Sequence, residues 1–464
     1  MPYRATTGRK SSFWERARNL VTQVAKSSPP RLALLIFAVA IGAFTALLMM
    51  PWATASGRSA QFHDALFVAT SAVTVTGLTP VNTADHWSLA GQIIILAGVQ
   101  LGGIGIITTA ALLAVSVTRH LGLHTRLMAQ EGISTGRLGE TGSLIRTVVI
   151  ASAVIETALA AVLIPRITIL EESLATGTWH GLFYAVSAFN NAGFVIHPEG
   201  LTSLGADPLV LWTVMLGVFL GSLGFPVLLM LWMAKWRVRR WSLHTKLTLE
   251  VTILLMILGA VLYALMEWNN GSTLGDMGTA EKLQSSLFAS VNMRSGGFSV
   301  VESNLENSET MLVTDALMFA GGGSASTAGG IKVTTIAVIW LAFLAEARGQ
   351  DESTAHGRTI PASSIRVAVS VVAVGLTLVL LSTLALMTVS GSEMGRPLYE
   401  SLSAFGTVGL TSGLTAELPP SGLYILAALM FAGRVGIITF AAALAVRQSR
   451  RRRYRYPESR PLIG

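Results

Sequence analysis

The chain has 464 residues, of which 52% are hydrophobic and 12% are charged, and its formal net charge is +8. An ordinary soluble domain carries about twice that charged fraction. The composition therefore excludes a soluble enzyme and predicts a protein of the lipid bilayer. The chain contains no cysteine, which excludes both a disulfide framework and a thiolate metal site.

Basic and acidic segments alternate along the apolar chain. Arg and Lys are concentrated in the N-terminal tail and after each of four long apolar regions, whereas the loops between these positions are rich in Asp and Glu. The positive-inside rule then predicts a multi-pass protein with both termini in the cytoplasm. The first apolar run, residues 32–50, is long enough to cross a bilayer and is followed by no small-residue cleavage site, so we expect a retained helix. Because the bases are spread over five segments, we expect no nucleic-acid binding.

One pattern occurs four times: a long apolar segment, a short apolar segment, a glycine-containing loop and a second long apolar segment. We place the four repeats at residues 31–117, 144–236, 247–345 and 365–446. We expect the remaining segments to be cytoplasmic: the tail 1–30, the linkers 118–143, 237–246 and 346–364, and the basic tail 447–464.

The short segments are too short to cross a membrane. They occupy residues 62–73, 179–189, 282–291 and 397–405. A helix of about 10 to 12 residues reaches roughly 15 to 18 Å, against about 30 Å of hydrocarbon. Each must therefore enter the bilayer and turn back, and irregular backbone at that depth is tolerated only beside protein or water.

The repeats together predict an all-α integral membrane protein: four M1–pore helix–M2 units around a pseudo-fourfold central pore, with eight transmembrane spans. Each unit crosses twice, so the four copies share one orientation and their loops can converge from one face. An inverted-repeat transporter would need an odd number of crossings per unit. Further glycines follow the loops at similar intervals, namely Gly102, Gly221, Gly321 and Gly433.

The glycine loops are the candidate selectivity filter. Backbone carbonyls can replace the hydration shell of a cation where no side chain intervenes, so we expect Gly77, Gly193, Gly297 and Gly409 to be the primary sites. The predicted filter comprises Thr74, Val75, Thr76, Gly77, Asn190, Asn191, Ala192, Gly193, Arg294, Ser295, Gly296, Gly297, Gly406, Thr407, Val408 and Gly409. The alternative is that these glycines only permit close helix packing. In the third loop Gly296 competes with Gly297, and the Gly-Phe pair shared with the second loop favours Gly297.

A glycine-rich stretch interrupts the second long segment of the third repeat. It comprises Gly321, Gly322, Gly323, Ser324, Ala325, Ser326, Thr327, Ala328, Gly329 and Gly330. Each glycine costs a helix about 1 kcal/mol relative to alanine, so we expect the span to break and the stretch to line the water path as a gate. A nucleotide-binding P-loop is excluded because Ile331 separates Gly330 from Lys332. The alternative is an ordinary turn outside the membrane.

Arg434 lies within an apolar helix, where an arginine costs at least about 3 kcal/mol unless it faces water or a partner. We expect it to bond the carbonyls of the glycine stretch or to set a barrier to cations; the alternative is a buried pair with Glu156 or Glu250. We expect Lys332 to extend to the cytoplasmic edge and Arg294 to pair with an acid.

Smaller polar groups carry less specific signals. The loop residues Asn190, Asn191, Thr74, Thr76 and Thr407 either brace the filter or cap the loops. The histidines form no metal-binding spacing, so we assign them to solvated surface. No nucleophilic triad or carboxylate pair is present, so we expect no enzymatic activity.

The loop sequences resemble the Trk/Ktr/HKT superfamily of potassium transporters over nearly the whole chain. The motifs are TVTGLT, FNNAGF, RSGGF and GTVGLT, with GSASTAGGIK and GRVG. The chain looks most like the KtrB branch, the ion-translocating membrane subunits of bacterial Ktr systems. Departures from the family pattern are Ser295 where Thr is common and Gly296 where Ala is common.

The resemblance implies a homodimer in the bacterial cytoplasmic membrane, with one pore per subunit, resting on a cytoplasmic KtrA-like RCK ring that binds nucleotide. It also implies that the glycine stretch is the intramembrane gating loop and that Arg434 lies near it. We therefore expect K⁺, and possibly Na⁺, as the transported ion, with no organic cofactor in this chain. By family analogy four filter glycines favour K⁺, since a serine in the first loop accompanies Na⁺ transport. The alternatives are an ion-coupled (Na⁺/K⁺ or H⁺/K⁺) secondary transporter and a membrane scaffold without ion flux.

Overall fold

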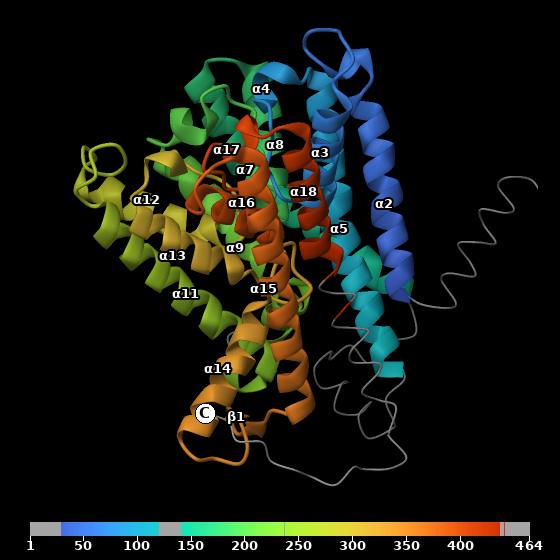
Figure 1. Ribbon diagram of the computed structural model, residues 1–464, viewed down its shortest axis with the longest axis vertical. Helices are drawn as coiled ribbons and strands as arrows, with labels where there is room; N and C mark the ends of the chain where they lie inside the picture. Colours follow the sequence, from blue (N-terminus) through green and yellow to red (C-terminus); the bar gives the residue numbers. More distant parts are fainter. Residues whose placement is uncertain (1–28, 120–140, 236, 437–439, 441–464) are drawn as a thin grey trace, which may run out of the picture.

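The computed structural model describes residues 29–119, 141–235, 237–436 and 440. The predicted tails and most of the first predicted linker, 118–143, lie outside these residues. The described part is predominantly helical (Figure 1). A two-stranded antiparallel hairpin, β1 (Thr354–Ala355) and β2 (Arg358–Thr359), follows the third repeat and pairs Thr354 with Thr359.

The helices follow the predicted order. The first two repeats contain α2 (Pro29–Leu48), α3 (Phe62–Thr74), α4 (Thr83–His86), α5 (Leu89–Arg119), α7 (Thr141–Glu171), α8 (Leu174–Asn190), α9 (Pro208–Leu223) and α10 (Phe225–Ala234). The last two contain α11 (Leu243–Glu267), α12 (Thr279–Met293), α13 (Ser308–Phe319), α14 (Val333–Ala347), α15 (Ala362–Ser390), α16 (Gly395–Gly406), α17 (Leu414–Glu417), α18 (Pro420–Phe431) and the π-helical segment η5 (Ala432–Gly436). Short 3-10 turns are η1 (Pro51–Ala53), η2 (Gly200–Leu204), η3 (Val238–Arg240) and η4 (Ser303–Leu305).

The four short helices α3, α8, α12 and α16 are present where the sequence predicts re-entrant segments. Each packs against the helices that flank it in its own repeat and also against a helix of the preceding repeat. The contacts between repeats are α3 with α18, α8 with α5, α12 with α9 and α16 with α13. This order of contacts closes on itself, so each short helix joins its own repeat to the one before it, and the first repeat to the fourth.

The second long segment is broken in two of the repeats. The predicted break within residues 321–330 separates α13 from α14. A second break, which the sequence analysis did not predict, bends α9 against α10 by 98°. At this point Gly224 has φ +89° and begins a helix with proline in its first turn. A positive φ, which glycine adopts without strain, ends α9 at Gly224. The proline that follows in the first turn of α10 has no N–H to donate to the preceding helix, so the helix does not continue straight.

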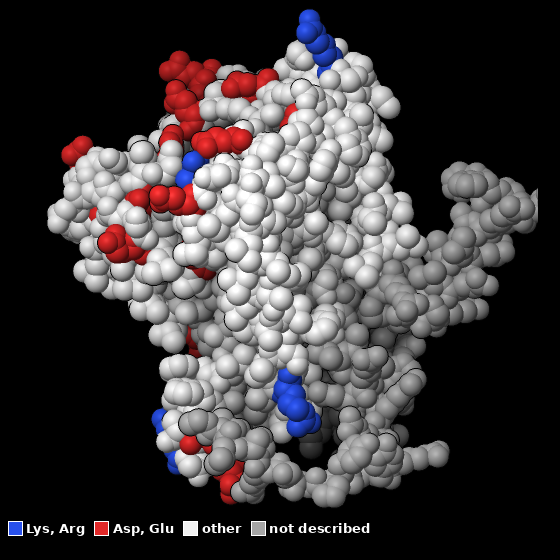
Figure 2. Space-filling model, in the orientation of Figure 1, with Lys and Arg blue, Asp and Glu red and all other residues white. Residues whose placement is uncertain are grey.

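Helix length and hydropathy identify three described helices that can cross a bilayer: Arg146–Glu171, Leu243–Glu267 and Ala362–Ser390. The bent pair α9 and α10 makes a fourth if it forms one span, and the apolar helices Ala33–Leu48, Leu89–Gly105, Val333–Ala347 and Pro420–Gly436 are shorter. The predicted number of eight spans stays a prediction. In Figure 2, Asp and Glu gather at one end of the visible face, and a wide uncharged belt separates them from charged residues at the other end. Such a belt fits a bilayer position.

The glycines downstream of the loops explain how closely the short helices are held. A Cβ atom on Gly102 would lie less than 3.0 Å from the carbonyl oxygen of Val73, in the last turn of α3. The same relation holds between Gly221 and Phe189 and between Gly433 and Phe405. In the third repeat Gly321 instead meets Gly329, because α13 has already ended at Phe319.

We expect Gly102→Ala to lower the apparent melting temperature of the detergent-solubilised protein, because the methyl group would push α5 away from α3. Overpacking of this kind typically costs about 1 to 3 kcal/mol. Gly42→Ala is the matched control, since its Cβ would meet no atom within 4 Å and alanine favours the helix. Equal melting temperatures for the two variants would contradict the proposed close packing.

Candidate functional site

The four predicted filter glycines all have left-handed backbone conformations. Their φ angles are +98° at Gly77, +66° at Gly193, +71° at Gly297 and +100° at Gly409. Residues with a Cβ adopt these angles only with strain. In the third loop the left-handed position is Gly297 and not Gly296, which agrees with the choice made from the Gly-Phe pair.

The four loops meet one another in a closed ring. A Cβ atom on any of these glycines would lie within about 3 Å of the carbonyl oxygen that precedes the glycine of the next loop. The pairs are Gly77 with Ala192, Gly193 with Gly296, Gly297 with Val408, and Gly409 with Thr76. Because the fourth loop returns to the first, one carbonyl from each loop lies at each junction. A side chain at any of the four positions would separate the loops.

Three loops leave their helices in the same way. The helix-terminating residues Val75, Asn191 and Thr407 have φ of +56°, +59° and +48°. Non-glycine residues in this region cost on the order of 1 to 3 kcal/mol each and persist where the surroundings enforce them. The amides of Gly77 and Gly409 donate to Ser71 Oγ and Ser403 Oγ at 3.0 and 3.1 Å.

The third loop is built differently. Its helix-terminating residue, Arg294, is right-handed with φ −87°. The carbonyl oxygen of Asn292 accepts from the amides of Ser295, Gly296 and Gly297 at 3.1, 2.9 and 3.3 Å. This tighter turn accommodates a loop that is one residue shorter than the other three, as counted from the Leu-Phe pair of the first three short helices and from Leu398-Tyr399 of the fourth.

Arg294 does not pair with an acid, and this prediction was wrong. Its side chain is buried, and NH1 donates to the carbonyl oxygen of Thr252 in α11 at 2.6 Å. Within the described residues no carboxylate lies within ion-pair distance of it. The arginine therefore ties the third loop to α11 through a backbone acceptor.

A buried polar network supports the second loop. The Asn190 side chain donates to Gln100 Oε1 at 2.8 Å and to Glu156 Oε1 at 3.1 Å, and Gln100 donates to both carboxylate oxygens of Glu156 at 3.0 Å. The side-chain amide of Asn191 and the hydroxyl of Ser295 are 3.0 Å apart, and this contact links the second loop to the third. These asparagines therefore connect separate elements. Gln100 was not identified from the sequence, where it is one of several scattered polar residues in an apolar helix.

The threonines of the first loop interact locally. Thr74 Oγ1 donates to the carbonyl oxygen of Thr70 at 2.7 Å and lies 2.8 Å from Thr76 Oγ1. This arrangement fits loop capping. The threonines of the first loop therefore cap that loop, whereas the asparagines of the second loop brace it against other elements.

The stretch 321–330 contacts two of the short helices that lead into the loops. Its residue Thr327 donates to the carbonyl oxygen of Phe189 in α8 at 3.3 Å, and a Cβ on Gly330 would lie 3.1 Å from the Cα of Gly406 in α16. The helices α8 and α16 belong to the second and fourth repeats, which are not neighbours in the ring. The stretch therefore links the loop ends of two short helices from repeats that are not adjacent in the ring.

Lys332 secures this stretch. Its ammonium group donates to the carbonyl oxygen of Ala328 at 2.6 Å and contacts that of Gly329 at 3.5 Å. The prediction that Lys332 extends to the cytoplasmic edge was therefore wrong, because its ammonium group binds carbonyl oxygens of the stretch itself. Elsewhere the stretch is bonded to the α9–α10 break, where the amide of Gly323 donates to Ser222 and that of Phe225 donates to Ala325.

Arg434 lies buried in η5, close to the fourth loop. Its NH1 contacts Thr407 Oγ1 at 3.4 Å, and among the described residues Nε and NH2 have no hydrogen-bond partner. The suggested acid partners are engaged elsewhere: Glu156 with Gln100, and Glu250 with His356 at 2.9 Å. Within the described residues Arg434 also makes no hydrogen bond to the carbonyl groups of the glycine stretch, so the expected bond to that stretch is not formed.

Comparison with known proteins identifies the family of the chain. A family model described as TrkH, cation transport protein, matches residues 6–452. The Ktr system potassium uptake protein B of Bacillus subtilis is 35% identical over 447 residues, covering 96% of this chain and 99% of the relative. The potassium/sodium uptake protein NtpJ of Enterococcus hirae is 35% identical over 430 residues, covering 90% and 93%.

A solved structure shares the fold. The crystal structure of the potassium transporter TrkH from Vibrio parahaemolyticus gives a TM-score of 0.71 at 16% identity, covering 88% of this chain and 83% of that one. The family model and the long alignments, together with the shared fold, lead to one conclusion. The chain belongs to the TrkH family of cation transport proteins.

Proposed function

We propose that this chain is the ion-translocating subunit of a bacterial potassium uptake system. K⁺ passes through the ring formed by Gly77, Gly193, Gly297 and Gly409. The single observation that carries the proposal is the closed ring, in which each loop presents a carbonyl oxygen beside the glycine of the next. The names of the relatives, Ktr system potassium uptake protein B and potassium/sodium uptake protein NtpJ, support K⁺ as the ion.

The ring has the chemistry that a dehydrated monovalent cation requires. Carbonyl oxygens replace the water ligands of the ion, and several weak sites in series let it leave again. The short helices end at the loops, so their C-terminal ends, which carry partial negative charge, stabilise a cation there. In this proposal the four repeats surround a pseudo-fourfold axis, with eight spans and both termini in the cytoplasm.

We assign the gate to the stretch 321–330, acting with Lys332 and Arg434. The stretch obstructs the path below the filter while Lys332 binds its carbonyl groups, and Arg434 adds a positive charge that opposes cation passage. The family resemblance further suggests a homodimer on a cytoplasmic, nucleotide-binding KtrA-like ring, which would move the stretch through the helices α13 and α14.

The filter proposal predicts that Gly409→Ala abolishes transport. Its Cβ would collide with the carbonyl oxygen of Thr76, and a penalty of about 1.4 kcal/mol in the barrier already reduces flux about tenfold. Rubidium uptake into proteoliposomes measures this effect.

Gly413→Ala is the matched control for this test. Its φ of +84° imposes the same kind of backbone strain, but its Cβ would meet only the end of Arg396, at 3.7 Å. Flux should fall much less in this variant than in Gly409→Ala. Equal flux in the two variants would contradict the filter assignment. Saturable uptake at a fixed Na⁺ or H⁺ stoichiometry would instead favour an ion-coupled transporter.

The gate proposal predicts that Lys332→Met increases K⁺ flux severalfold without changing the preference for K⁺ over Na⁺. The variant removes the bonds to Ala328 and Gly329 but leaves the ring intact. Lys282→Met is the control, because Lys282 also donates to a backbone carbonyl, that of Trp268 at 2.8 Å, far from the stretch in sequence. A changed ion preference at unchanged flux would show that Lys332 acts on the filter and not on a gate.

A further inference from the structure

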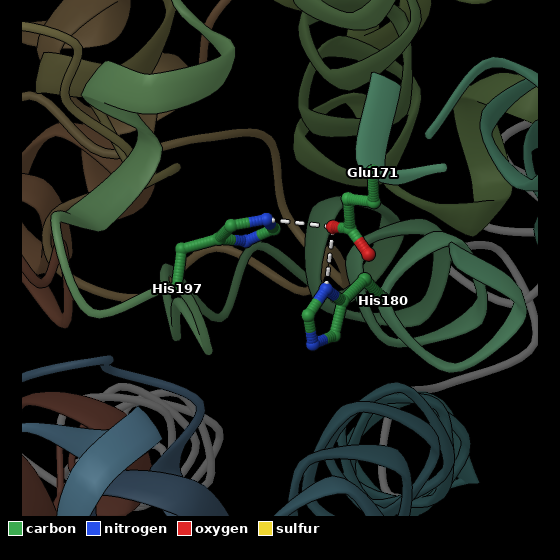
Figure 3. Close-up of side chains that lie close together, drawn as sticks. All are labelled: Glu171, His180 and His197. Carbon is green, nitrogen blue, oxygen red and sulfur yellow. Dashed lines mark hydrogen bonds and ion pairs between the residues drawn. The ribbon is translucent and has the colours of Figure 1, made fainter. Parts of the chain in front are cut away.

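Three potential metal ligands lie together outside the ring. They are Glu171 at the end of α7, His180 in α8, and His197 in the segment between the second filter loop and α9 (Figure 3). Glu171 Oε1 lies 2.6 Å from His180 Nδ1 and 2.8 Å from His197 Nε2, and all three ligand atoms lie within 4.8 Å of one another. The prediction that the histidines belong to solvated surface was therefore wrong for this pair.

The cluster is mostly shielded from solvent. The side chains of His180, Glu171 and His197 are 19%, 16% and 11% exposed. The hydroxyl of Thr176 is a further neighbour of this carboxylate, and in the described part of the chain the second carboxylate oxygen, Glu171 Oε2, is buried without a hydrogen-bond partner. A buried carboxylate oxygen in this state is a free electron-pair donor beside two imidazole nitrogens, which makes the group suited to a cation.

His197 is oriented by a neighbour on its far side. Its Nδ1 lies 2.5 Å from the hydroxyl of Tyr184, which also accepts from the amide of Ile196 at 3.3 Å. The Tyr184 and His197 rings are stacked, 15° from parallel. Histidine ligands of metals are commonly held in this way through the nitrogen that does not bind the metal. Tyr184 thus fixes Nε2 of His197 toward Glu171 (Figure 3).

The donor set selects a class of ion. Two imidazoles and one carboxylate are a typical protein ligand set for Zn²⁺ and similar divalent transition metals, with bonds of about 2.0 to 2.2 Å and a fourth position for water. Ca²⁺ and Mg²⁺ prefer oxygen ligands throughout. At such bond lengths the ligand atoms of a tetrahedral site stand about 3.3 Å apart, so metal binding would replace the two hydrogen bonds between the carboxylate and the histidines.

We propose that Glu171, His180 and His197 form a binding site for a divalent transition-metal ion of the Zn²⁺ class. The ion would join the end of α7 to α8 and to the segment that leaves the second filter loop at Gly193. These three elements hold the outer side of that loop, so an ion there cross-links its support. The site is separate from the ring and requires no assumption about the ion that the ring conducts.

The test uses the purified full-length protein without a polyhistidine tag. Isothermal titration with ZnCl₂ should give one site per chain, and Co²⁺ should produce the visible absorption of a tetrahedral complex. His180→Gln and His197→Gln should each weaken Zn²⁺ binding by at least about tenfold. Zn²⁺ should raise the melting temperature of the unmodified protein and not that of these variants.

His63→Gln is the matched control. His63 also lies beside a carboxylate, with Nε2 3.6 Å from Asp64 Oδ1, but belongs to no described group of three ligands. It should bind Zn²⁺ like the unmodified protein. Melting temperatures measured without metal verify that each variant is folded. Unchanged Zn²⁺ affinity in folded His180→Gln and His197→Gln, or absence of binding to the unmodified protein, would overturn the proposal.

Discussion

The structure depends on the close approach of one backbone to another, at positions where a side chain would not fit. At the ring, each glycine leaves room for a carbonyl oxygen of the next loop. One layer outward, Gly102, Gly221 and Gly433 leave room for the last turn of a short helix. Small residues serve this purpose in membranes because the hydrophobic effect does not drive helices together there, so packing and hydrogen bonds must. The ring and its support are therefore specified by the same residue type.

Polar groups hold the loops in place, because glycine by itself leaves the loop backbone conformationally free. Ser71 and Ser403 bind the amides of Gly77 and Gly409, while Asn190 joins the second loop to a buried carboxamide and carboxylate. Hydrogen bonds of this kind pair buried polar atoms, each of which would cost on the order of 1 to 3 kcal/mol if it were left unpaired. Glycine supplies the shape of the ring, and its neighbours hold the loops in place.

Features that depend on a local pattern could be predicted from the sequence. The positions of the short helices, the glycines of the loops and the break within residues 321–330 could be predicted in this way, whereas α8 and α12 extend beyond their predicted bounds. The bend at Gly224 was missed because one glycine in an apolar run also fits a straight helix. The partners of Arg294 and Lys332 are backbone carbonyls. Every residue has such a carbonyl, so the sequence does not indicate which one accepts the hydrogen bond. Glu171, His180 and His197 are far apart in the chain, and only the fold brings them together.

The third repeat departs from the others in two places, and the departures are connected. It has the shorter loop with a right-handed helix end at Arg294, and it provides the stretch that crosses between α8 and α16. Gly321 packs against its own stretch at Gly329, whereas the corresponding glycines pack against a short helix. The third repeat therefore gives up the glycine contact that holds the short helix in each of the other repeats, and its stretch reaches α8 and α16 instead.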